Sequence, residues 1–377
     1  MENMTDRTFA EVFPPGEFIK DELEARGWSQ LDLAEILGRD PVQINLMVKG
    51  KQAITPETAT QLGEAFGTGA QFWLNLETAY RLSQVEPAES PVARRANLYE
   101  QFPVREMVKR GWVDYSANVE VLEKRFCDFF EISALDQVPR LAHAARKSTK
   151  GPATLSQTAW LFRARQLAKA VWAAAFSDRS LRQCLAALSL MRKSREDVRR
   201  VPQVLAEHGI RLVIVELLPN TKIDGVTFWN DKKSPVIALS FRYDRIDWFW
   251  HTLAHEMIHI KNKDGMVEPI LDTDIVGEGE ESGQQNDAER IVDSLACDFL
   301  VPKRDLNNFI GRTGPYYSKH HIILFAERAK VHPGIIVGQL QHRKEMSYAY
   351  NREMLVKVRS ILSPSALTDG WGNVAPV

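Results

Sequence analysis

The sequence predicts a multidomain protein that is mainly α-helical and has a small β-sheet. Three observations support this fold class: the length of 377 residues, short glycine-punctuated helix patterns up to about residue 81, and short β-branched runs after residue 210. The length exceeds what one ordinary hydrophobic core serves. We expect an N-terminal all-α helix-turn-helix domain, a helical middle region, a C-terminal α+β domain, and a closing helix with a disordered tail from about Ser363, over residues 1–82, 83–200, 201–345 and 346–377.

Composition describes a water-soluble chain. The charged fraction is 26% and the hydrophobic fraction 44%, as in globular proteins. We find no run of 18 apolar residues and no signal-peptide pattern at the start, so we expect a cytoplasmic protein without a membrane partner. Cys127, Cys184 and Cys297 are widely separated, which excludes a disulfide framework and a CxxC metal site.

The charges are distributed unevenly along the chain. Residues 1–90 hold 7 Lys and Arg against 15 Asp and Glu, a net charge of −8, whereas residues 91–200 hold 21 against 11, a net charge of +10. Either the two blocks attract each other, or the basic block meets an acidic partner such as nucleic acid, or both are solvated helix faces. The sequence leaves these alternatives open.

The first domain is predicted from helix starts and stops. Ser29 and Asp32 have the spacing of a capping box, and Gly38 ends the helix that they begin. Pro41 starts the next helix, PVQINLMVKG, which Gly50 closes. A helix, a tight glycine turn and a second short helix make the helix-turn-helix arrangement.

The stretch from PPGEFIKDELEARGWSQ to FWLNLETAYRL resembles the helix-turn-helix domain of HigA-type antitoxins, within the Xre/Cro repressor class. The resemblance implies a recognition helix at about 41–48 and a homodimer that binds two half-sites of a double-stranded DNA operator. Gln43 and Asn45 are best placed to reach base edges, and Arg39, Lys49 and Lys51 to face phosphates. The alternative is that these residues are only exposed polar positions and that the domain binds protein, which its negative charge favours.

The middle and C-terminal regions change from helical to strand patterns. WLFRARQLAKAVWAAAF predicts a helix over 160–176. Three β-branched runs, at 211–217, 225–230 and 235–240, predict strands, and GVTFW is a candidate edge strand that could hold an extended substrate. A helix over about 244–260 follows them.

The sequence HTLAHEMIHI lies in that last helix and has an HExxH pattern. His255 and His259 are four residues apart, so both rings project from one helix face and can share one zinc ion (Zn2+). Glu256 lies beside them, where it can take a proton from a metal-bound water without binding the metal. His251 lies about 12 Å before His259 along the helix axis, too far to share an ion with it, so we expect a residue of the core, of the surroundings of the ligands, or of the cleft.

A catalytic zinc needs a third protein ligand. Glu289 and Asp293 lead the apolar face of a later helix, so we assign Glu289 as the third ligand, with Glu281 as an alternative. We expect Asp293 to orient a ligating histidine. The acidic loop between the two helices is interpreted as a flap rather than a source of ligands.

The segment from about Arg199 to Leu340 resembles the ImmA/IrrE family of zinc metallo-endopeptidases, on HTLAHEMIHI, the ERIVDSLA helix ending in FLVP, and VHPGIIVGQLQH. The resemblance implies a zincin-like fold and cleavage of helix-turn-helix repressors under stress. Ile291 replaces an acid that relatives often carry, so that acid is not essential here. Tyr243, His251 and His332 are candidates to stabilise the oxyanion of the transition state or to line the cleft.

Three functions fit the whole sequence. The leading hypothesis is a DNA-binding transcriptional regulator with a zinc endopeptidase domain, which cleaves a repressor or antitoxin, or its own chain between residues 82 and 95. The second is a non-enzymatic antitoxin or repressor that neutralises a toxin and uses the zincin fold as a sensor. The third is a peptidase whose first domain docks substrate. Glu256 favours an enzyme, because a structural zinc site needs no general base.

Overall fold

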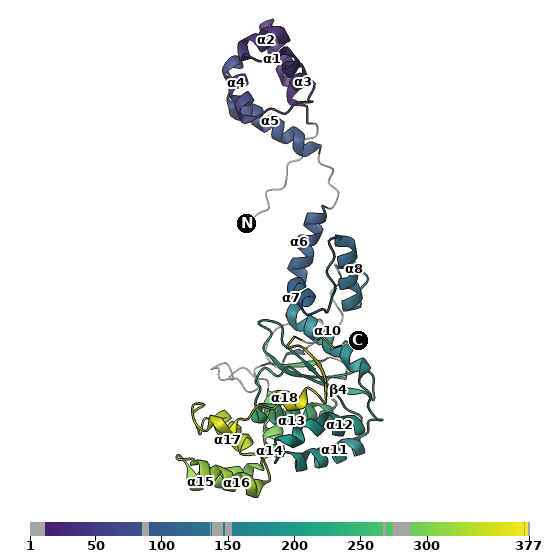
Figure 1. Cartoon of the computed structure of the whole chain (residues 1–377), viewed down its shortest axis with the longest axis vertical. Helices are drawn as coiled ribbons and strands as arrows, with labels where there is room; N and C mark the ends of the chain where they lie inside the picture. The colour runs from purple at the N-terminus through teal and green to yellow at the C-terminus, as the bar shows by residue number, and fades with distance from the viewer. Residues whose placement is uncertain are drawn as a thin grey trace. The chain divides into compact units, whose positions relative to one another are not determined.

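The chain folds into two compact units, Met1–Ser90 and Pro91–Val377 (Figure 1). The structure is a computed structural model that describes residues 12–84, 90–135, 137, 146–147, 153–266, 269–273, 287–372 and 374–375. The division lies near the predicted boundary after residue 82. No helix among these residues has both the length and the hydropathy of a bilayer span.

Five helices make up the described part of the first unit. They are α1 (Pro15–Arg26), α2 (Gln30–Leu37), α3 (Pro41–Val48), α4 (Pro56–Phe66) and α5 (Ala70–Ser83). The predicted capping box is confirmed, because the Ser29 hydroxyl accepts from the Asp32 amide and the Asp32 carboxylate accepts from the Ser29 amide. Helix α2 ends at Gly38, whose φ of 62° is in the left-handed region that favours glycine. Apolar side chains from all five helices form the core, among them Ile19, Leu33, Ile44, Leu62 and Trp73.

A mixed sheet forms the centre of the second unit. Its six strands in the described residues have the order β1-β5-β3-β4-β2-β6. They are β1 (Arg146–Lys147), β2 (Arg211–Val215), β3 (Ile223–Trp229), β4 (Pro235–Leu239), β5 (Ile270–Thr273) and β6 (Leu367–Asp369). The three predicted strands are confirmed as β2, β3 and β4. The prediction of an edge strand at GVTFW is wrong, because β3 pairs antiparallel with both β4 and β5.

Helices cover both faces of this sheet, and the side chains of β2 and β4 alternate between two cores. Val213 and Val215 join one core, to which α6 (Pro91–Gln101), α7 (Val104–Lys109), α8 (Val119–Phe130) and α10 (Leu155–Ala170) contribute. Leu212 and Ile214 join the other core. Helical elements that contribute to it include α11 (Asp178–Met191), η1 (Glu196–Arg200), α12 (Val201–Glu207), α13 (Ile246–Asn262), α14 (Asp287–Leu300), α15 (Lys303–Thr313), α16 (Lys319–Ala329) and α17 (Pro333–His342).

The middle region is therefore not a separate body. Helix α10 packs on β2, and the Trp160 indole N–H donates to the Val215 carbonyl oxygen at 3.0 Å. The predicted helix over 160–176 is wrong in its second part, because α10 ends at Ala170. Beyond this end, the Val171 carbonyl oxygen accepts from the Arg211 side chain at 3.0 Å, and the Ala174 amide donates to the Ala206 carbonyl oxygen at 2.8 Å. These backbone groups form hydrogen bonds with distant parts of the chain instead of continuing the helix.

The C-terminal segment contains η3 (Arg352–Met354), α18 (Arg359–Leu362) and the edge strand β6. The expectation of a disordered tail from Ser363 does not hold for its described residues, since β6 pairs parallel with β2. The buried Asp369 at the end of β6 forms an ion pair with the buried Arg163 of α10. This pairing and this ion pair order a segment whose polar, glycine-containing composition is typical of disorder.

Candidate metal centre and nucleic-acid interface

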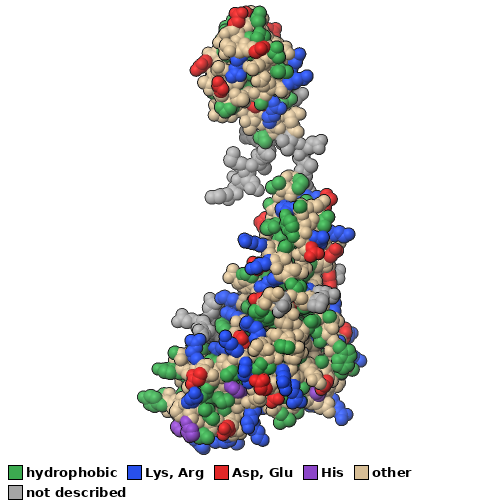
Figure 2. All heavy atoms as spheres, viewed as in Figure 1, with side chains coloured by type: hydrophobic (Ala, Val, Ile, Leu, Met, Phe, Trp, Pro, Cys, Tyr) green, Lys and Arg blue, Asp and Glu red, His purple; other side chains and the backbone are tan. Residues whose placement is uncertain are grey.

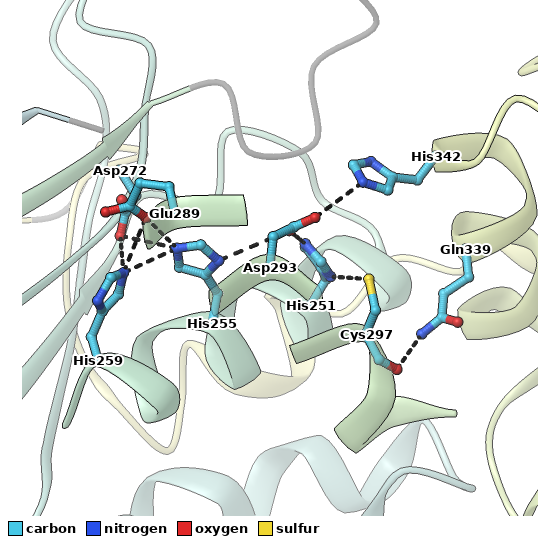
Figure 3. Close-up of polar contacts among 9 residues, drawn as sticks. All are labelled: His251, His255, His259, Asp272, Glu289, Asp293, Cys297, Gln339 and His342. Atoms are coloured by element: carbon cyan, nitrogen blue, oxygen red, sulfur yellow. Dashed lines mark hydrogen bonds and ion pairs between the residues drawn. The ribbon is translucent and has the colours of Figure 1, made fainter. Parts of the chain in front are cut away.

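Helix α13 places the two HExxH histidines side by side in the interior of the second unit (Figure 3). Their Nε2 atoms lie 3.1 Å apart, and each side chain is 1% exposed. The predicted helix over about 244–260 is confirmed by α13, at Ile246–Asn262. Two buried imidazole nitrogens at this separation point at one common position.

Glu289, which begins the buried face of α14, reaches the same position. Its Oε2 atom lies 3.4 Å from Nε2 of His255 and 3.4 Å from Nε2 of His259. The structure thus brings together the three residues that the sequence suggested as metal ligands. Glu281, the alternative, lies outside the described residues.

Asp272 of β5 completes the group, and the sequence analysis missed it. Its Oδ2 atom lies 3.5 Å from Nε2 of His255 and 3.5 Å from Nε2 of His259, and the residue is fully buried. It had been included in a flap, although the apolar Ile270 and Leu271 before it were a signal for a short strand. The structure places the four donors within 4.8 Å of one another.

The spacing and chemistry of the four donors fit zinc. A tetrahedral ion with bonds of about 2.0–2.1 Å holds its donors about 3.3–3.4 Å apart, and the distances given above are 3.1–3.5 Å. Oε2 of Glu289 and both carboxylate oxygens of Asp272 are buried without a hydrogen-bond partner among the described residues. Buried carboxylate oxygens are costly unless a cation compensates them. Imidazole and carboxylate are also ligands that zinc accepts.

Glu256 is held beside this group without being part of it. Its Oε2 atom accepts a hydrogen bond from the Thr227 hydroxyl at 2.6 Å, and its Oε1 atom has no partner within the described part of the chain. A Cβ atom at Gly225 would lie 2.2 Å from Oε1, so β3 leaves room for the carboxyl group only because residue 225 is glycine. Burial, and then the charge of Asp272, raises the pKa of Glu256 well above its usual value.

The pKa values describe the metal-free group. Burial would lower the pKa of His255, but the charge of Asp272 and the hydrogen bonds with Asp272 and Glu289 together raise it well above its usual value. Burial would also lower the pKa of His259, but its hydrogen bond with Glu289 and the charge of Asp272 raise it to about 9. Burial acts to raise the pKa of Glu289, whereas the two histidines lower it to about 2. A metal must therefore displace protons from the imidazoles.

The partners of the ligating histidines differ from those expected. Asp264, just beyond α13, is 3.0 Å from Nδ1 of His259 and can orient that ring. Asp293, which we expected to orient a ligand, is 3.9 Å from Nδ1 of His255, beyond hydrogen-bonding distance. Its carboxylate is instead engaged by His251 at 2.9 Å and by His342 at 3.3 Å. Asp293 thus does not bond to His255, because its carboxylate contacts the rings of His251 and His342.

His251 also belongs to a second, smaller group. Its Nδ1 atom lies 4.0 Å from the Cys297 sulfur, and His251, Asp293 and Cys297 have donor atoms within 4.8 Å of one another. Burial would lower the pKa of His251, but the charges of Asp293 and Cys297 and the hydrogen bond with Asp293 together raise it to about 10. A cavity of about 20 Å³ beside His251 and Cys297 has room for about one water molecule.

Tyr243 and His332 lie at the other end of α13. His332 caps α17, where its Nδ1 atom accepts from the Gly334 amide, and Gly334 faces the first residue of α13. Tyr243 precedes that first residue, Ile246, and lies against the Arg242 guanidinium. Ile246 is about 14 Å from His255 along the helix axis. The structure therefore does not bring either residue to the metal centre.

The five predicted DNA-contacting residues lie on or beside α3, which has the bounds of the predicted recognition helix. Gln43, Lys49 and Lys51 are exposed. Asn45 is half-buried and donates to the Gln30 side chain at 3.1 Å, and the Arg39 guanidinium donates to the Gln61 side chain at 2.8 Å. On the face of the first unit seen in Figure 2, acidic side chains lie among the basic ones.

Comparison with known proteins assigns a family to the first unit. The family model described as "Helix-turn-helix" matches residues 19–73. Virulence-associated protein I of Dichelobacter nodosus is 42% identical over 73 residues, which are 19% of this chain and 68% of that protein. The uncharacterized HTH-type transcriptional regulator YddM of Escherichia coli (strain K12) is 33% identical over 72 residues, which are 19% of this chain and 77% of that protein.

Among solved structures, the Pseudomonas aeruginosa antitoxin HigA with higBA promoter is 31% identical, over 20% of this chain and 98% of that chain, with a TM-score of 0.19. Each of these three proteins covers about a fifth of the sequence. The family match lies within the first unit, whereas the metal centre lies in the second.

Proposed function

We propose, on the premise that this chain belongs to the helix-turn-helix family through residues 19–73, that it is a DNA-binding transcriptional regulator with a zinc-dependent endopeptidase in its second unit. The substrate class is a helix-turn-helix repressor or antitoxin, cleaved in trans or within the chain itself. The setting is a stress or toxin–antitoxin response.

DNA binding is supported by the family and by the surface of α3. A relative of the first unit is named as a transcriptional regulator. The exposed Gln43 amide suits the edge of adenine in the major groove, and Lys49 and Lys51 are exposed for phosphates. Asn45 must release Gln30, and Arg39 must release Gln61, before either can contact DNA. A homodimer would present two such helices to two half-sites.

The observation that carries the peptidase is the buried four-donor group beside a general base. Bound zinc supplies Lewis acidity, which activates water and polarises a peptide carbonyl. Glu256 can receive a proton at Oε1, which has no partner, while the Thr227 hydroxyl fixes Oε2. The same carboxyl group can return the proton to the leaving amine.

The test compares wild type with Glu256→Gln, incubated with zinc and the repressor of a neighbouring operon. Cleavage by wild type alone is expected, with zinc affinity equal in the two proteins, because Glu256 is not a metal donor. Equal cleavage by both proteins would contradict the proposal. A parallel incubation without repressor detects self-cleavage between residues 82 and 95.

One observation favours a second function, a non-enzymatic antitoxin or repressor whose metal centre is a sensor or a docking module for a toxin. Four protein donors fill a tetrahedral zinc site, as in structural sites. Under this alternative, Glu256→Gln retains every activity of the protein, and zinc removal releases a partner protein or DNA. A third possibility, that the first unit docks a protein substrate, predicts no gel shift with the DNA upstream of its own gene.

A further inference from the structure

We propose that Asp272 is a fourth protein ligand of the metal ion, so that the resting protein has no open coordination position for water. This inference rests on the proposed peptidase function and concerns the regulation of the same site. His255, His259 and Glu289 are the three ligands that the sequence suggested. The fourth donor comes from a different element, strand β5.

The distances do not distinguish Asp272 from Glu289. The nearest oxygen of Asp272 is 3.5 Å from both imidazole nitrogens, and that of Glu289 is 3.4 Å from the same two atoms. The donor atoms of all four residues lie within 4.8 Å of one another, so an ion bonded to both histidines and Glu289 has the Asp272 oxygen close by as a fourth ligand. In Figure 3 both carboxylates lie beside the rings of His255 and His259.

The sheet fixes Asp272 in this place. Strand β5 pairs with β3 on one side and with β1 on the other, and Asp272 is in register with Gly225. Its neighbour Leu271 packs into the core on the α10 side, so Asp272 projects to the α13 side. Both of its carboxylate oxygens are buried and lack a hydrogen-bond partner within the described residues. A carboxylate so placed needs a cation.

A metal site filled by four protein ligands and a general base beside it have different uses, and both must be explained. Structural zinc sites have four protein ligands, whereas catalytic sites keep one position for water. Glu256 and the glycine that makes room for it are features of a catalytic site. Both sets of features are satisfied when Asp272 occupies the position of the water in the resting state and leaves it during turnover. Movement of β5, or of the Asp272 side chain alone, would then open the site.

The test uses the full chain with cobalt(II) in place of zinc and azide as the probe. Azide changes the visible spectrum of cobalt only when it gains a coordination position. The wild-type spectrum is expected to be four-coordinate and unchanged by azide, whereas that of Asp272→Ala shifts on azide addition. A wild-type response equal to that of the variant would overturn the proposal, because the position would already be open.

Zinc affinity gives the second readout, with Asp264→Ala as the matched control. Asp264 contacts the far nitrogen of His259 and not the metal position, so its loss should weaken zinc binding about 10- to 100-fold. Removal of a direct ligand should weaken it more, by over about 100-fold in Asp272→Ala. A smaller loss in Asp272→Ala than in Asp264→Ala would contradict the ligand assignment.

A more conservative variant keeps the test valid if Asp272→Ala does not fold. Asp272→Asn keeps the side-chain volume and replaces the charged ligand by a weak neutral one, so it should show the azide response even if Asp272→Ala fails to fold. None of these measurements uses a peptide. If the metal results hold but wild type and Asp272→Ala both cleave nothing, the peptidase function fails and the ligand assignment stands. If azide reaches wild-type cobalt, the assignment fails whatever the cleavage assay shows.

Discussion

The two units of this chain place their candidate functional residues in opposite environments. In the first unit, Gln43, Lys49 and Lys51 lie within nine residues of sequence and their side chains are exposed. In the second unit, the candidate metal donors come from two helices and a strand, and all four are buried: His255, His259, Asp272 and Glu289. A surface that meets a macromolecule must be exposed, whereas a metal centre gains from the exclusion of water.

Because of this difference, a substitution in one unit should affect the function of that unit alone. Function in the first unit depends on a locally encoded helix and on that unit's own core. Function in the second depends on tertiary packing that brings distant residues together. Changes in one unit should therefore leave the function of the other unaffected, and departures from this expectation would reveal coupling between the units.

The largest expected effect is that of pH on zinc binding. The pKa of His259 is raised to about 9 and that of His255 is also raised, so protons compete with the metal for the imidazole nitrogens at pH 6. Through His259 alone, zinc affinity should rise about 100-fold between pH 6 and 8, and proton competition at His255 should add to this rise. Isothermal titration in several buffers measures both the affinity and the protons released.

The first unit provides the control for this experiment, because residues 1–90 contain no histidine. DNA affinity should stay constant between pH 6 and 8 at fixed salt. The stability of the metal-free fold should change with pH in the opposite direction to zinc affinity. The raised pKa of His259 stabilises the metal-free fold below pH 6.5, and this contribution is lost as pH rises through about 9. A zinc affinity independent of pH would show that the imidazoles are not the ligands.

Leu62→Ala should perturb the first unit alone. Leu62 is fully buried in its core, so the substitution should lower the free energy of unfolding of that unit by about 2–5 kcal/mol. DNA binding should weaken as the folded population falls, with zinc affinity unchanged. Leu239→Ala, in the core of the second unit, should give the reverse pattern. Calorimetry of both variants measures this, and a change of zinc affinity in Leu62→Ala would refute independence.

Gly225→Ala should impair catalysis and spare metal binding. The added Cβ would lie 2.2 Å from Oε1 of Glu256 and must displace the general base. A displacement of this kind should reduce the cleavage rate about 100-fold. Gly311→Ala is the matched control, since a Cβ at Gly311 meets no atom within 4 Å. Unchanged cleavage in Gly225→Ala would show that the position of Glu256 does not matter.

Gln43→Ala should have the smallest effect. Loss of an amide contact to a base should cost about 1–3 kcal/mol of discrimination between operator and altered sequence. Gln71, another exposed glutamine, lies on α5 rather than on the predicted recognition helix, so Gln71→Ala should leave DNA binding unchanged. Gel-shift titrations at constant salt compare the two. Equal affinity of wild type and Gln43→Ala for both DNA sequences would remove Gln43 from the interface.

The sequence predicted most accurately what local patterns encode. The spacing of Ser29 and Asp32 predicted a capping box, and the four-residue spacing of His255 and His259 predicted a shared helix face. Glu289 was also found, because a helix repeats its faces every three to four residues. Each of these features depends on one helix at a time.

Features that depend on pairing between distant segments were missed. Asp272 joins the candidate donor group only through the pairing of β5 with β3, which no local pattern specifies. The same pairing makes β3 an inner strand rather than an edge. Asp293 lies on the expected face of α14, but its carboxylate contacts His342 of another helix, α17, instead of a candidate metal ligand. The tail was ordered by contacts with β2 and Arg163.

The most direct test is X-ray absorption spectroscopy at the zinc edge of the full-length protein with one equivalent of zinc. The account predicts one ion with two imidazole nitrogens and two carboxylate oxygens at about 2.0–2.2 Å and no sulfur. A sulfur shell at about 2.3 Å would place the ion at Cys297 and His251 instead. That result would contradict the assignment of His255, His259, Asp272 and Glu289 as the metal centre.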